Sequence, residues 1–380
     1  MLQKEGTRRL FLVFHGRFPS EKAASLFAAK SAEAFAAKDI SVTLLAPRRL
    51  GRVRTDYLAY YTIRHPFNTV FLPTIDLIGL KFLQDAAFRL SLLIFSKWTF
   101  FYLLFHASKQ DIIYSAETLP LLFASLRFPH TCIEIHDYPE RALWFYRILF
   151  KRVSHIVVTT QWKLERLKKD FPGCVRKTFY EPNAVSVEDF SLAISKEEAR
   201  KKLSLPLKAK LVVYTGHLYA WKGVDTLAEA AKHIDADIYI VGGTEKDIAR
   251  FKKKWRVIPN LRVVGHKPYE EMPLWQKAAD VLVLPNTRKE EISVHYTSPM
   301  KLFEYMASGT PVVASDIPSI REIAGDGRAL LVTPDDPEAL ADGIRRVVKG
   351  ETAGTTERAR EWIQEHTWGR RMERILQAIE

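Results

Sequence analysis

The residues best suited to chemistry lie between Ser298 and Glu304, in the second half of this 380-residue chain. Ser298 is a favourable N-cap and Pro299 a favourable first helical residue, so a helix is expected to begin here. The free N–H groups of its first turn could hold a phosphate, and Lys301 adds a full positive charge. Glu304 lies five residues beyond Pro299, roughly 7–8 Å along the axis at ~1.5 Å per residue. That separation suits a carboxylate that binds ribose hydroxyls while the helix end binds a diphosphate.

A second cluster contains Gly216, His217 and Lys222. Gly216 ends an expected strand, and its missing Cβ lets a ligand approach closely. Lys222 comes just before an expected helix and is placed to neutralise a leaving diphosphate. Taken singly, these features also fit a capped structural helix and a surface lysine. The argument for a phosphate site therefore rests on the two clusters together.

Several cofactor motifs are absent from the sequence. No G-x-G-x-x-G follows an expected strand and no G-x-x-x-x-G-K-[S/T] occurs, which argues against a dinucleotide site and a P-loop. The histidines show no metal-ligand spacing. Asp235 and Asp237 resemble a metal-binding aspartate pair, but they precede an expected strand, at the end opposite the ligand edge. We therefore expect neither a metal nor a tightly bound cofactor.

The elements that must position these clusters are short β-branched runs alternating with helical patterns such as Ala23–Lys38. Continuous apolar strands separated by helices indicate parallel sheets covered on both faces. The expected fold class is α/β, with two doubly wound Rossmann-like domains facing a cleft and ligands at the carboxyl ends of the strands. The expected strands are Leu10–His15, Ser41–Ala46, Asp111–Ser115, Cys132–His136 and His155–Thr159 in the first half, and Leu211–Thr215, Asp237–Val241, Leu261–Val264, Asp280–Leu284, Pro311–Ser315 and Ala329–Thr333 in the second.

The positive charge is concentrated in the first half. Residues 1–190 hold 27 Lys and Arg against 17 Asp and Glu, whereas the remainder has a net charge of only +3. This change and the polar stretch that follows place a linker near residues 186–208. A basic half suggests an anionic partner such as phospholipid, nucleic acid or a phosphorylated substrate, unless it is simply a solvated surface. No nucleic-acid-binding module accompanies the charge, so no nucleic acid is expected.

The most apolar segment is Phe88–Ala107, rich in Phe, Trp, Tyr and Leu. Arg89 and Lys97 interrupt it, so no uninterrupted apolar run reaches the ~18 residues needed to span a bilayer. Two interpretations stay open: a helix lying in an anionic membrane interface, or a helix buried between a sheet and a neighbouring helix. The two cysteines, Cys132 and Cys174, make no disulfide framework, which fits a reducing compartment.

Together and in this order, the two clusters resemble the family 4 glycosyltransferases, which adopt the two-Rossmann fold called GT-B. The resemblance covers nearly the whole chain, and such an ordered set of motifs is more specific than any one of them. It includes Gly16–Lys22, Glu134–Asp137, Pro182-Asn183, Gly216–Gly223, Val241–Gly243, Val264–Glu271, Ala278–Pro285, Ser298–Ser315, Pro318–Glu322 and Thr367-Trp368.

The resemblance implies a division of labour between the domains. Residues 205–355 would bind a nucleoside-diphosphate sugar as co-substrate, residues 1–190 would bind a glycan or lipid-linked acceptor, and a helix within 356–380 would cross back to the first domain. The family usually retains the anomeric configuration and needs no metal. Its site would use His136, Lys222 and Glu304 in catalysis, and Gly16, Gly216, His217, Gly242, His266, Lys267, Tyr296, Thr297, Ser298 and Lys301 with Lys222 and Glu304 in donor binding.

Individual roles follow from the same resemblance. Lys222 would neutralise the diphosphate and Glu304 would bind ribose, while Gly16 would let its loop approach the diphosphate. Gly242 and the loop His266–Lys267 would border the base. His136 would position the transferred sugar or stabilise the transition state. Read without the family, His136 is as well explained by a local hydrogen bond beside Asp137.

One position departs from the family pattern. Many members carry Glu-x7-Glu; Glu304 matches the second Glu, but Tyr296 stands at the position of the first. A tyrosine can hydrogen-bond a sugar but carries no negative charge near pH 7. The expected function is a retaining, metal-independent glycosyltransferase at the cytoplasmic face of a membrane. A catalytically weak nucleotide-sugar-binding partner subunit and a sugar-nucleotide epimerase of the same fold remain alternatives.

Overall fold

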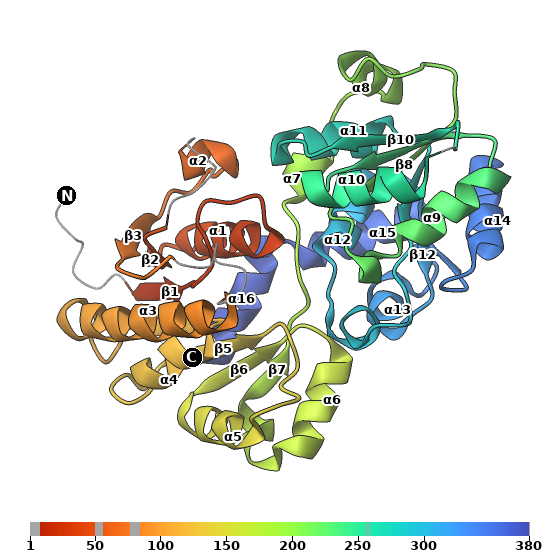
Figure 1. Cartoon of the computed structure of the whole chain (residues 1–380). Helices are drawn as coiled ribbons and strands as arrows, with labels where there is room; N and C mark the ends of the chain where they lie inside the picture. The colour runs from red at the N-terminus through yellow and green to blue at the C-terminus, as the bar shows by residue number, and fades with distance from the viewer. Residues whose placement is uncertain (1–7, 50–55, 77–83, 257, 380) are drawn as a thin grey trace. The chain divides into compact units, whose positions relative to one another are not determined.

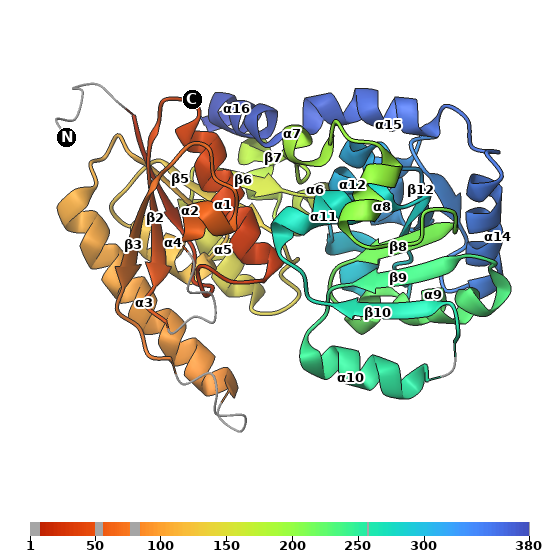
Figure 2. The ribbon, with the colours of Figure 1, turned by 90° about the horizontal axis from the view of Figure 1, so that it is seen from above.

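The computed structural model describes residues 8–49, 56–76, 84–256 and 258–379, which form two compact units (Figures 1 and 2). Unit 1 comprises Met1–Glu181 and Trp368–Glu380, and unit 2 comprises Pro182–Thr367. The sequence places a linker near residues 186–208, but Val187 and Phe190 are buried in the core of unit 2. Ala359 and Ile363 are buried in that core as well. Of the segment 356–380, only the part from Trp368 onward therefore belongs to unit 1.

Unit 1 contains a parallel sheet with the strand order β3-β2-β1-β4-β5-β6-β7. The strands are β1 (Arg9–Val13), β2 (Ser41–Pro47), β3 (Asn68–Leu72), β4 (Ile112–Ser115), β5 (Thr131–Ile135), β6 (His155–Val158) and β7 (Thr178–Tyr180). The five expected strands form the centre of the sheet. The sequence misses the two edge strands, β3 and β7, because their residues are mostly half-buried or exposed and form no continuous apolar run.

Unit 2 contains a second parallel sheet with the strand order β10-β9-β8-β11-β12-β13. Its strands are β8 (Leu211–Thr215), β9 (Asp237–Val241), β10 (Leu261–Gly265), β11 (Val281–Leu284), β12 (Val312–Ser315) and β13 (Leu330–Val332). Every expected strand is confirmed to within one residue at each end. In both sheets the order reverses beside the first strand, between β1 and β4 and between β8 and β11. Such a reversal is where ligands bind in open α/β sheets.

Helices cover both faces of each sheet (Figures 1 and 2). The expected helix Ala23–Lys38 is observed as α1, and Phe27, Ala28, Ala32 and Phe35 lie on its buried face. The helices of unit 1 are α1 (Ala23–Ala36), α2 (Tyr57–Tyr60), α3 (Gln84–His106), α4 (Thr118–Ala124), α5 (Leu143–Arg152), α6 (Gln161–Asp170) and α16 (Trp368–Ile379), and those of unit 2 are α7 (Val187–Phe190), α8 (Lys196–Lys202), α9 (Val224–Ala230), α10 (Glu245–Lys254), α11 (Met272–Ala278), α12 (Met300–Ser308), α13 (Pro318–Ala324), α14 (Pro337–Val348) and α15 (Thr355–Ile363).

Helix α3 contains the apolar segment singled out in the sequence. Against that expectation, the helix is long and apolar enough to cross a membrane. Of its most apolar stretch, 28% is buried within the protein. The buried side carries Ser91, Phe95, Thr99 and Leu103, which recur every four residues and pack on unit 1. The outward side carries large apolar residues, so α3 is neither a plain core helix nor a polar surface helix.

Helix α16 packs against α1 and completes unit 1. Its Arg371 is fully buried, and Nη2 lies 2.6 Å from Oε1 of Glu134 on β5, which is also fully buried. The hydroxyl of Tyr114 donates a hydrogen bond to the same carboxylate. A charged network thus joins the C-terminal helix to the centre of the first sheet.

Candidate functional site

The site predicted in unit 2 is built at the carboxyl ends of β8 and β11, where the strand order reverses. After β8 the chain continues through Gly216 into a short turn, Ala220–Lys222, and then through Gly223 into α9. Gly223 has φ +66°, and a Cβ there would lie 1.8 Å from the carbonyl oxygen of Pro285, which follows β11. Only glycine permits this close packing, so the position of Lys222 is fixed by the chain on both sides of the reversal.

Lys301 lies in the first turn of α12 and points toward Gly216. Its Nζ lies 4.0 Å from the centroid of the Tyr214 ring, and a Cβ on Gly216 would lie 2.5 Å from the same Nζ. Among the described residues this buried Nζ has no hydrogen-bond partner. Burial lowers the pKa of Lys301 to about 7, and Glu304 only partly opposes that effect. An ammonium group held over an aromatic face without an anion is suited to receive one.

Lys222 is held in the same region. Its Nζ lies 3.6 Å from the centroid of the Trp221 ring. Burial, together with repulsion from Lys301, keeps the pKa of Lys222 well below its usual value. Both lysines would gain from a bound diphosphate, because its negative charge pairs with Lys301 and offsets the repulsion that Lys301 exerts on Lys222.

Glu304 is buried one turn further along α12, with a residue exposure of 7%. The hydroxyl of Tyr269 donates to Oε1 at 3.4 Å, and Nε2 of Gln276 donates to Oε2 at 3.5 Å. Burial raises the pKa of Glu304 to about 7, although Lys301 and these donors lower it. The sequence assigns Glu304 to ribose binding and leaves its burial open; the structure makes it a buried carboxylate with two long hydrogen bonds.

The start of α12 differs from the expectation. The helix begins at Met300, Pro299 is the residue before it, and the helix has no side-chain cap. Ser298 instead accepts a hydrogen bond at 3.0 Å from the backbone N–H of Asn183, and the Asn183 side-chain amide donates to the carbonyl of Ser298. The prediction of Ser298 as N-cap is therefore wrong, because its hydroxyl is used to hold the segment Pro182-Asn183.

Tyr296 and Thr297 lie in the turn before Ser298. Residues Ile292–Tyr296 form a π-helical turn, and the N–H of Thr297 donates to the carbonyl of Ile292 at 3.0 Å. This turn packs against the turn that carries Lys222. Tyr296, which replaces the family's first Glu, is buried.

The remaining predicted residues of unit 2 follow neighbouring strands. The N–H of Gly216 donates to the carbonyl of Val241, and the N–H of Gly242 donates to that of Gly265, both at 2.7 Å. His217 stacks on Tyr219 with ring centroids 5.0 Å apart. His266 and Lys267 directly follow β10. The structure thus lines up Gly216, Gly242 and His266 along one edge of the sheet, as the sequence indicates.

Gly16 and His136 belong to unit 1. Gly16 follows β1, and a Cβ there would lie 2.1 Å from the ring of Phe14. His136 follows β5; its Nε2 lies 3.5 Å from Oε1 of Glu134, and its ring meets the Phe27 ring edge-on at 4.7 Å. Burial lowers the pKa of His136, and Glu134 opposes this shift. The partner of the imidazole is therefore Glu134 rather than the neighbouring Asp137.

Several side chains at this site are not apparent from the sequence. Tyr305 accepts the N–H of Thr215 at 2.9 Å and so ties α12 to the end of β8. Tyr214, Tyr269 and Gln276 contact Lys301 or Glu304 as described above. Only Tyr214 and Tyr305 carry a signal, because they adjoin residues that the sequence singles out. Tyr269 and Gln276 lie far from Glu304 in sequence and become visible only when α11 packs on α12.

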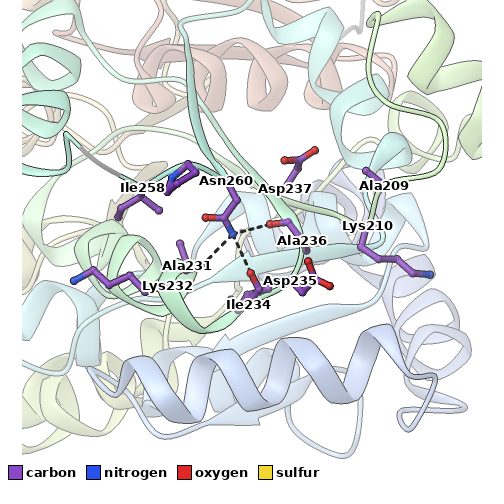
Figure 3. Close-up of a pocket in the computed structure, with 11 residues that line it drawn as sticks. Ala209, Lys210, Ala231, Lys232, Ile234, Asp235, Ala236, Asp237, Ile258 and Asn260 are labelled. Atoms are coloured by element: carbon purple, nitrogen blue, oxygen red, sulfur yellow. Dashed lines mark hydrogen bonds between the residues drawn. The ribbon is translucent and has the colours of Figure 1, made fainter.

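The opposite edge of the sheet holds a different pocket (Figure 3). It lies at the amino ends of β8 and β9, and Lys210, Asp235 and Asn260 are among its lining residues. Nδ2 of Asn260 donates to three backbone carbonyls at 2.9–3.1 Å, so this side chain acts as a structural brace. Asp237 begins β9, which confirms that the aspartate pair lies away from the ligand edge. In the described part of the chain, no three His, Cys, Asp or Glu side chains gather to hold a metal ion.

The comparisons with known proteins agree with this geometry. Residues 195–367 match the family described as Glycosyl transferases group 1. These residues belong to that family. The matched group 1 segment includes every predicted site residue of unit 2, from Gly216 to Glu304.

Two curated relatives and one solved structure extend the comparison to the rest of the chain. TuaC of Bacillus subtilis, a glycosyltransferase assigned to teichuronic acid biosynthesis, is 30% identical over 220 residues, which are 56% of this chain and 52% of TuaC. The phosphatidyl-myo-inositol mannosyltransferase of Mycobacterium tuberculosis is 28% identical over 211 residues, 53% of this chain and 50% of that enzyme. The chain thus spans about half the length of these curated relatives.

The structure of HepE from Anabaena in complex with UDP superposes with a TM-score of 0.74 at 17% identity, over 98% of this chain and 99% of that one. This likeness establishes the fold across both units. The GT-B fold and the resemblance to the family 4 glycosyltransferases are therefore confirmed. The group 1 segment supplies the second of the two Rossmann-like units.

Proposed function

We propose that this chain is a glycosyltransferase that moves a sugar from a nucleoside diphosphate to a glycan or lipid-linked acceptor. The observation that carries this proposal is the pair Lys222 and Lys301 at the carboxyl edge of the group 1 segment: the charge of Lys301 lowers the pKa of Lys222, and the buried Nζ of Lys301 has no hydrogen-bond partner among the described residues. UDP is bound by the structural neighbour HepE, and the mannosyltransferase relative is named for a phosphatidyl-inositol acceptor. Both names fit a diphosphate donor and an acceptor of lipid type.

The donor site assigns one task to each group. Lys222 and Lys301 hold the diphosphate, and the charge that they supply to the leaving group lets the reaction proceed without a metal. Glu304 binds the ribose hydroxyls, with Tyr269 and Gln276 fixing its orientation. Gly242 and His266 border the base at the neighbouring strand ends. Tyr296 takes the place of the family's first Glu as a neutral hydrogen-bonding group toward the sugar.

The transfer proceeds with retention of configuration. The bond between the anomeric carbon and the diphosphate oxygen breaks, the acceptor hydroxyl attacks the same face, and its proton passes to the leaving diphosphate. His136 accepts a hydrogen bond from the transferred sugar. Because Glu134 lies beside Nε2, we assign the imidazole proton to that nitrogen, which leaves Nδ1 as the acceptor.

The location that we propose is the cytoplasmic face of a membrane. The outward side of α3 exposes a stripe of large apolar residues, among them Leu93, Phe101, Leu104 and Phe105. Helix α4 contacts both α3 and α5, and α5 adds the exposed Trp144. Exposed Arg89 and Lys97 on α3 and Arg147 on α5 provide positive charge for anionic lipid. We call this set of apolar and basic residues on α3 and α5 the apolar surface of unit 1.

The donor class is tested by thermal melting with UDP, GDP, ADP, CDP and dTDP. At about a hundred times its dissociation constant, a ligand stabilises by roughly 2.7 kcal/mol, which moves the melting temperature by a few degrees. We expect one nucleotide to give such a shift with wild type and none with Lys222→Ala. Lys349→Ala, an exposed lysine at the end of α14, is the matched control and should keep the shift. No shift with any nucleotide would contradict the donor site.

The replacement of Glu by Tyr296 favours one alternative, a partner subunit that binds a nucleotide sugar without transferring it. The two functions separate once the nucleotide is known. Transfer from the matching sugar nucleotide to an added acceptor, with retention seen by NMR of the product, supports the enzyme. Nucleotide binding without transfer or hydrolysis supports the partner subunit, and release of an altered free sugar supports an epimerase.

A further inference from the structure

A second polar cluster occupies the carboxyl edge of the sheet in unit 1, at the reversal between β1 and β4. His15 and Arg17 follow β1, Arg49 follows β2, and Glu117 follows β4. We propose that Arg49 and Arg17 bind a phosphate group of the acceptor, beside the apolar surface of unit 1. This inference rests on the proposed function, and it names the chemical class of the acceptor.

Arg49 is the centre of the cluster. Its Nη2 lies 2.7 Å from Nε2 of His15 and donates to Oγ of Ser91 at 2.8 Å. Both partners are neutral: His15 is buried, and burial followed by the charge of Arg49 lowers the pKa of His15 to about 3. Since a guanidinium only donates, His15 Nε2 is the acceptor and its proton lies on Nδ1.

Among the described residues, the half-buried guanidinium of Arg49 has no carboxylate in direct contact, and Asp76 and Glu117 act on it only through longer-range charge. Within the described residues no carboxylate lies within 4.0 Å of it, and its buried Nε has no hydrogen-bond partner. Burial lowers the pKa of Arg49; Asp76 opposes the shift, and Arg17 adds to it by repulsion. A cation that is partly removed from water and paired only with neutral groups is unfavourable unless an anion binds.

Arg17 supplies the second positive group. One nitrogen donates to Oδ2 of Asp76 at 3.4 Å, a long contact, while its buried Nε has no partner in the described part of the chain. Glu117, the other nearby carboxylate, accepts the backbone N–H of His15 at 3.0 Å. Asp76 contacts one nitrogen of Arg17 and Glu117 accepts a backbone N–H, so both carboxylates leave the Nε atoms of the two arginines without a partner among the described residues. A tetrahedral anion with several oxygens suits two arginines better than a single carboxylate does.

The surroundings indicate what the phosphate is attached to. His15 is packed between the rings of Phe88 and Phe95 on α3, each at a centroid distance of 5.3 Å. Phe88 is itself exposed, and the apolar stripe of α3 continues from it. A molecule whose phosphate reaches Arg49 therefore lies next to an apolar helix face. This juxtaposition fits an acceptor in which a phosphate links a polar head to a lipid.

The test compares Arg49→Gln with Arg48→Gln in the full chain. The two changes remove the same charge at adjacent positions, but Arg48 is exposed. Two probes separate the sources of phosphate. Glycerol phosphate, followed by thermal melting, represents a soluble ester, and phosphatidylcholine vesicles with and without phosphatidylinositol represent a lipid headgroup.

We expect Arg49→Gln to weaken binding of one probe about tenfold or more, which is the effect of losing one charged hydrogen bond. Arg48→Gln should bind as wild type does, and Arg49→Lys should recover part of the loss. Response to glycerol phosphate assigns a soluble acceptor, and response to phosphatidylinositol alone assigns a lipid acceptor. Equal binding by both Gln variants, or no binding of either probe by wild type, would overturn the proposal.

The nucleotide-induced melting shift serves as the folding control for all variants. It reports on unit 2, and an unchanged melting temperature without ligand shows that unit 1, which holds Arg49, is folded as well. If the nucleotide does not raise the melting temperature of wild type, that result instead contradicts the proposed donor site. The two proposals thus fail independently.

Discussion

Lys301, in the first turn of α12, and Glu304, one turn further along, both have shifted pKa values because their side chains are buried. A lysine with a pKa near 7 is largely neutral in mildly alkaline solution, whereas a diphosphate binds its charged form. Binding of the nucleotide must therefore be accompanied by proton uptake. The same burial leaves Glu304 partly protonated near neutral pH, so the unliganded site is less charged than its residue types suggest.

We expect the affinity for the nucleotide to fall as the pH rises above about 7. The loss approaches about tenfold per pH unit, because each molecule bound must first protonate Lys301. Calorimetric titration at several pH values measures it. In Lys301→Arg the guanidinium stays charged, so the slope should flatten, with Lys222 contributing what remains. Lys349→Arg serves as the matched control; an unchanged slope in Lys301→Arg would contradict this account.

The sequence identifies most residues of this site but not their state. Lys222, Lys301 and Glu304 are predictable because they flank an expected strand end and helix start. Their depressed or raised pKa values are not predictable, because they result mainly from burial, which depends on how other segments pack around these side chains. Ser298 shows the same limit. A serine before a proline predicts a helix cap, but the Ser298 hydroxyl accepts a hydrogen bond from the backbone N–H of Asn183 instead.

At the scale of single elements, α16 has the clearest energetic role. Burial alone would raise the pKa of Glu134, but Arg371 and His136 hold it below its usual value. The carboxylate is thus charged in the core and depends on a helix more than two hundred residues away in sequence. Arg374 on the same helix makes a partly exposed pair with Glu181, at 2.7 Å.

We expect Arg371→Met to lower the free energy of unfolding by about 3–5 kcal/mol, because it leaves a buried carboxylate unpaired. Arg374→Met removes the same charge from a more exposed pair and should cost only ~0–1 kcal/mol. Urea denaturation measures both. Glu134→Gln combined with Arg371→Met should recover part of the loss, and equal losses for the two single variants would contradict the prediction.

The pH dependence of this pair has a defined sign. The lowered pKa of Glu134 contributes stability that is present above its usual value and is lost as the pH falls through the lowered one. In Arg371→Met the carboxylate loses its cation and takes up a proton more easily. The difference between wild type and this variant should therefore shrink as the solution becomes acidic.

The strands of both sheets that read as apolar runs are predicted, and they are found within two residues of their expected ends. Partial burial alone does not prevent prediction, because the edge strands β10 and β13 are only partly buried and are still expected from the sequence. Strands β3 and β7 lie at the sheet edges with mixed burial, and nothing in their composition separates them from loops. The sequence indicates helix α3 but not which of its sides faces the protein. Its buried side carries the polar Ser91 and Thr99, whereas its outward side carries the apolar Phe101 and Phe105.

At the scale of the whole molecule, charge and apolar area coincide in unit 1. We expect the chain to pellet with vesicles that contain anionic lipid, and less with phosphatidylcholine alone. Phe105→Glu should weaken binding about tenfold or more, because burial of one Phe contributes roughly 1.5–3 kcal/mol. Phe105 is 83% exposed; Leu207→Glu, on an exposed leucine of unit 2, is the matched control.

Salt separates the two contributions to vesicle binding. Raising the ionic strength from 0.1 M to 1 M shortens the Debye length from ~10 Å to ~3 Å, so the part due to basic residues should disappear. The part due to α3 should persist. Equal amounts of protein left in the supernatant with both lipid mixtures would contradict membrane binding.

The division of the chain has a consequence for its synthesis. Unit 2 is one continuous segment inserted between Glu181 and Trp368, whereas unit 1 is made of two segments. On the ribosome, which adds about 5–20 residues per second, the whole of unit 2 is complete before Arg371 is translated. Glu134 is therefore without its ion-pair partner Arg371 while more than two hundred further residues are translated. The domain begun first is the one that finishes last, and a nascent chain stalled before α16 exposes an unfinished core to the cell's proteases.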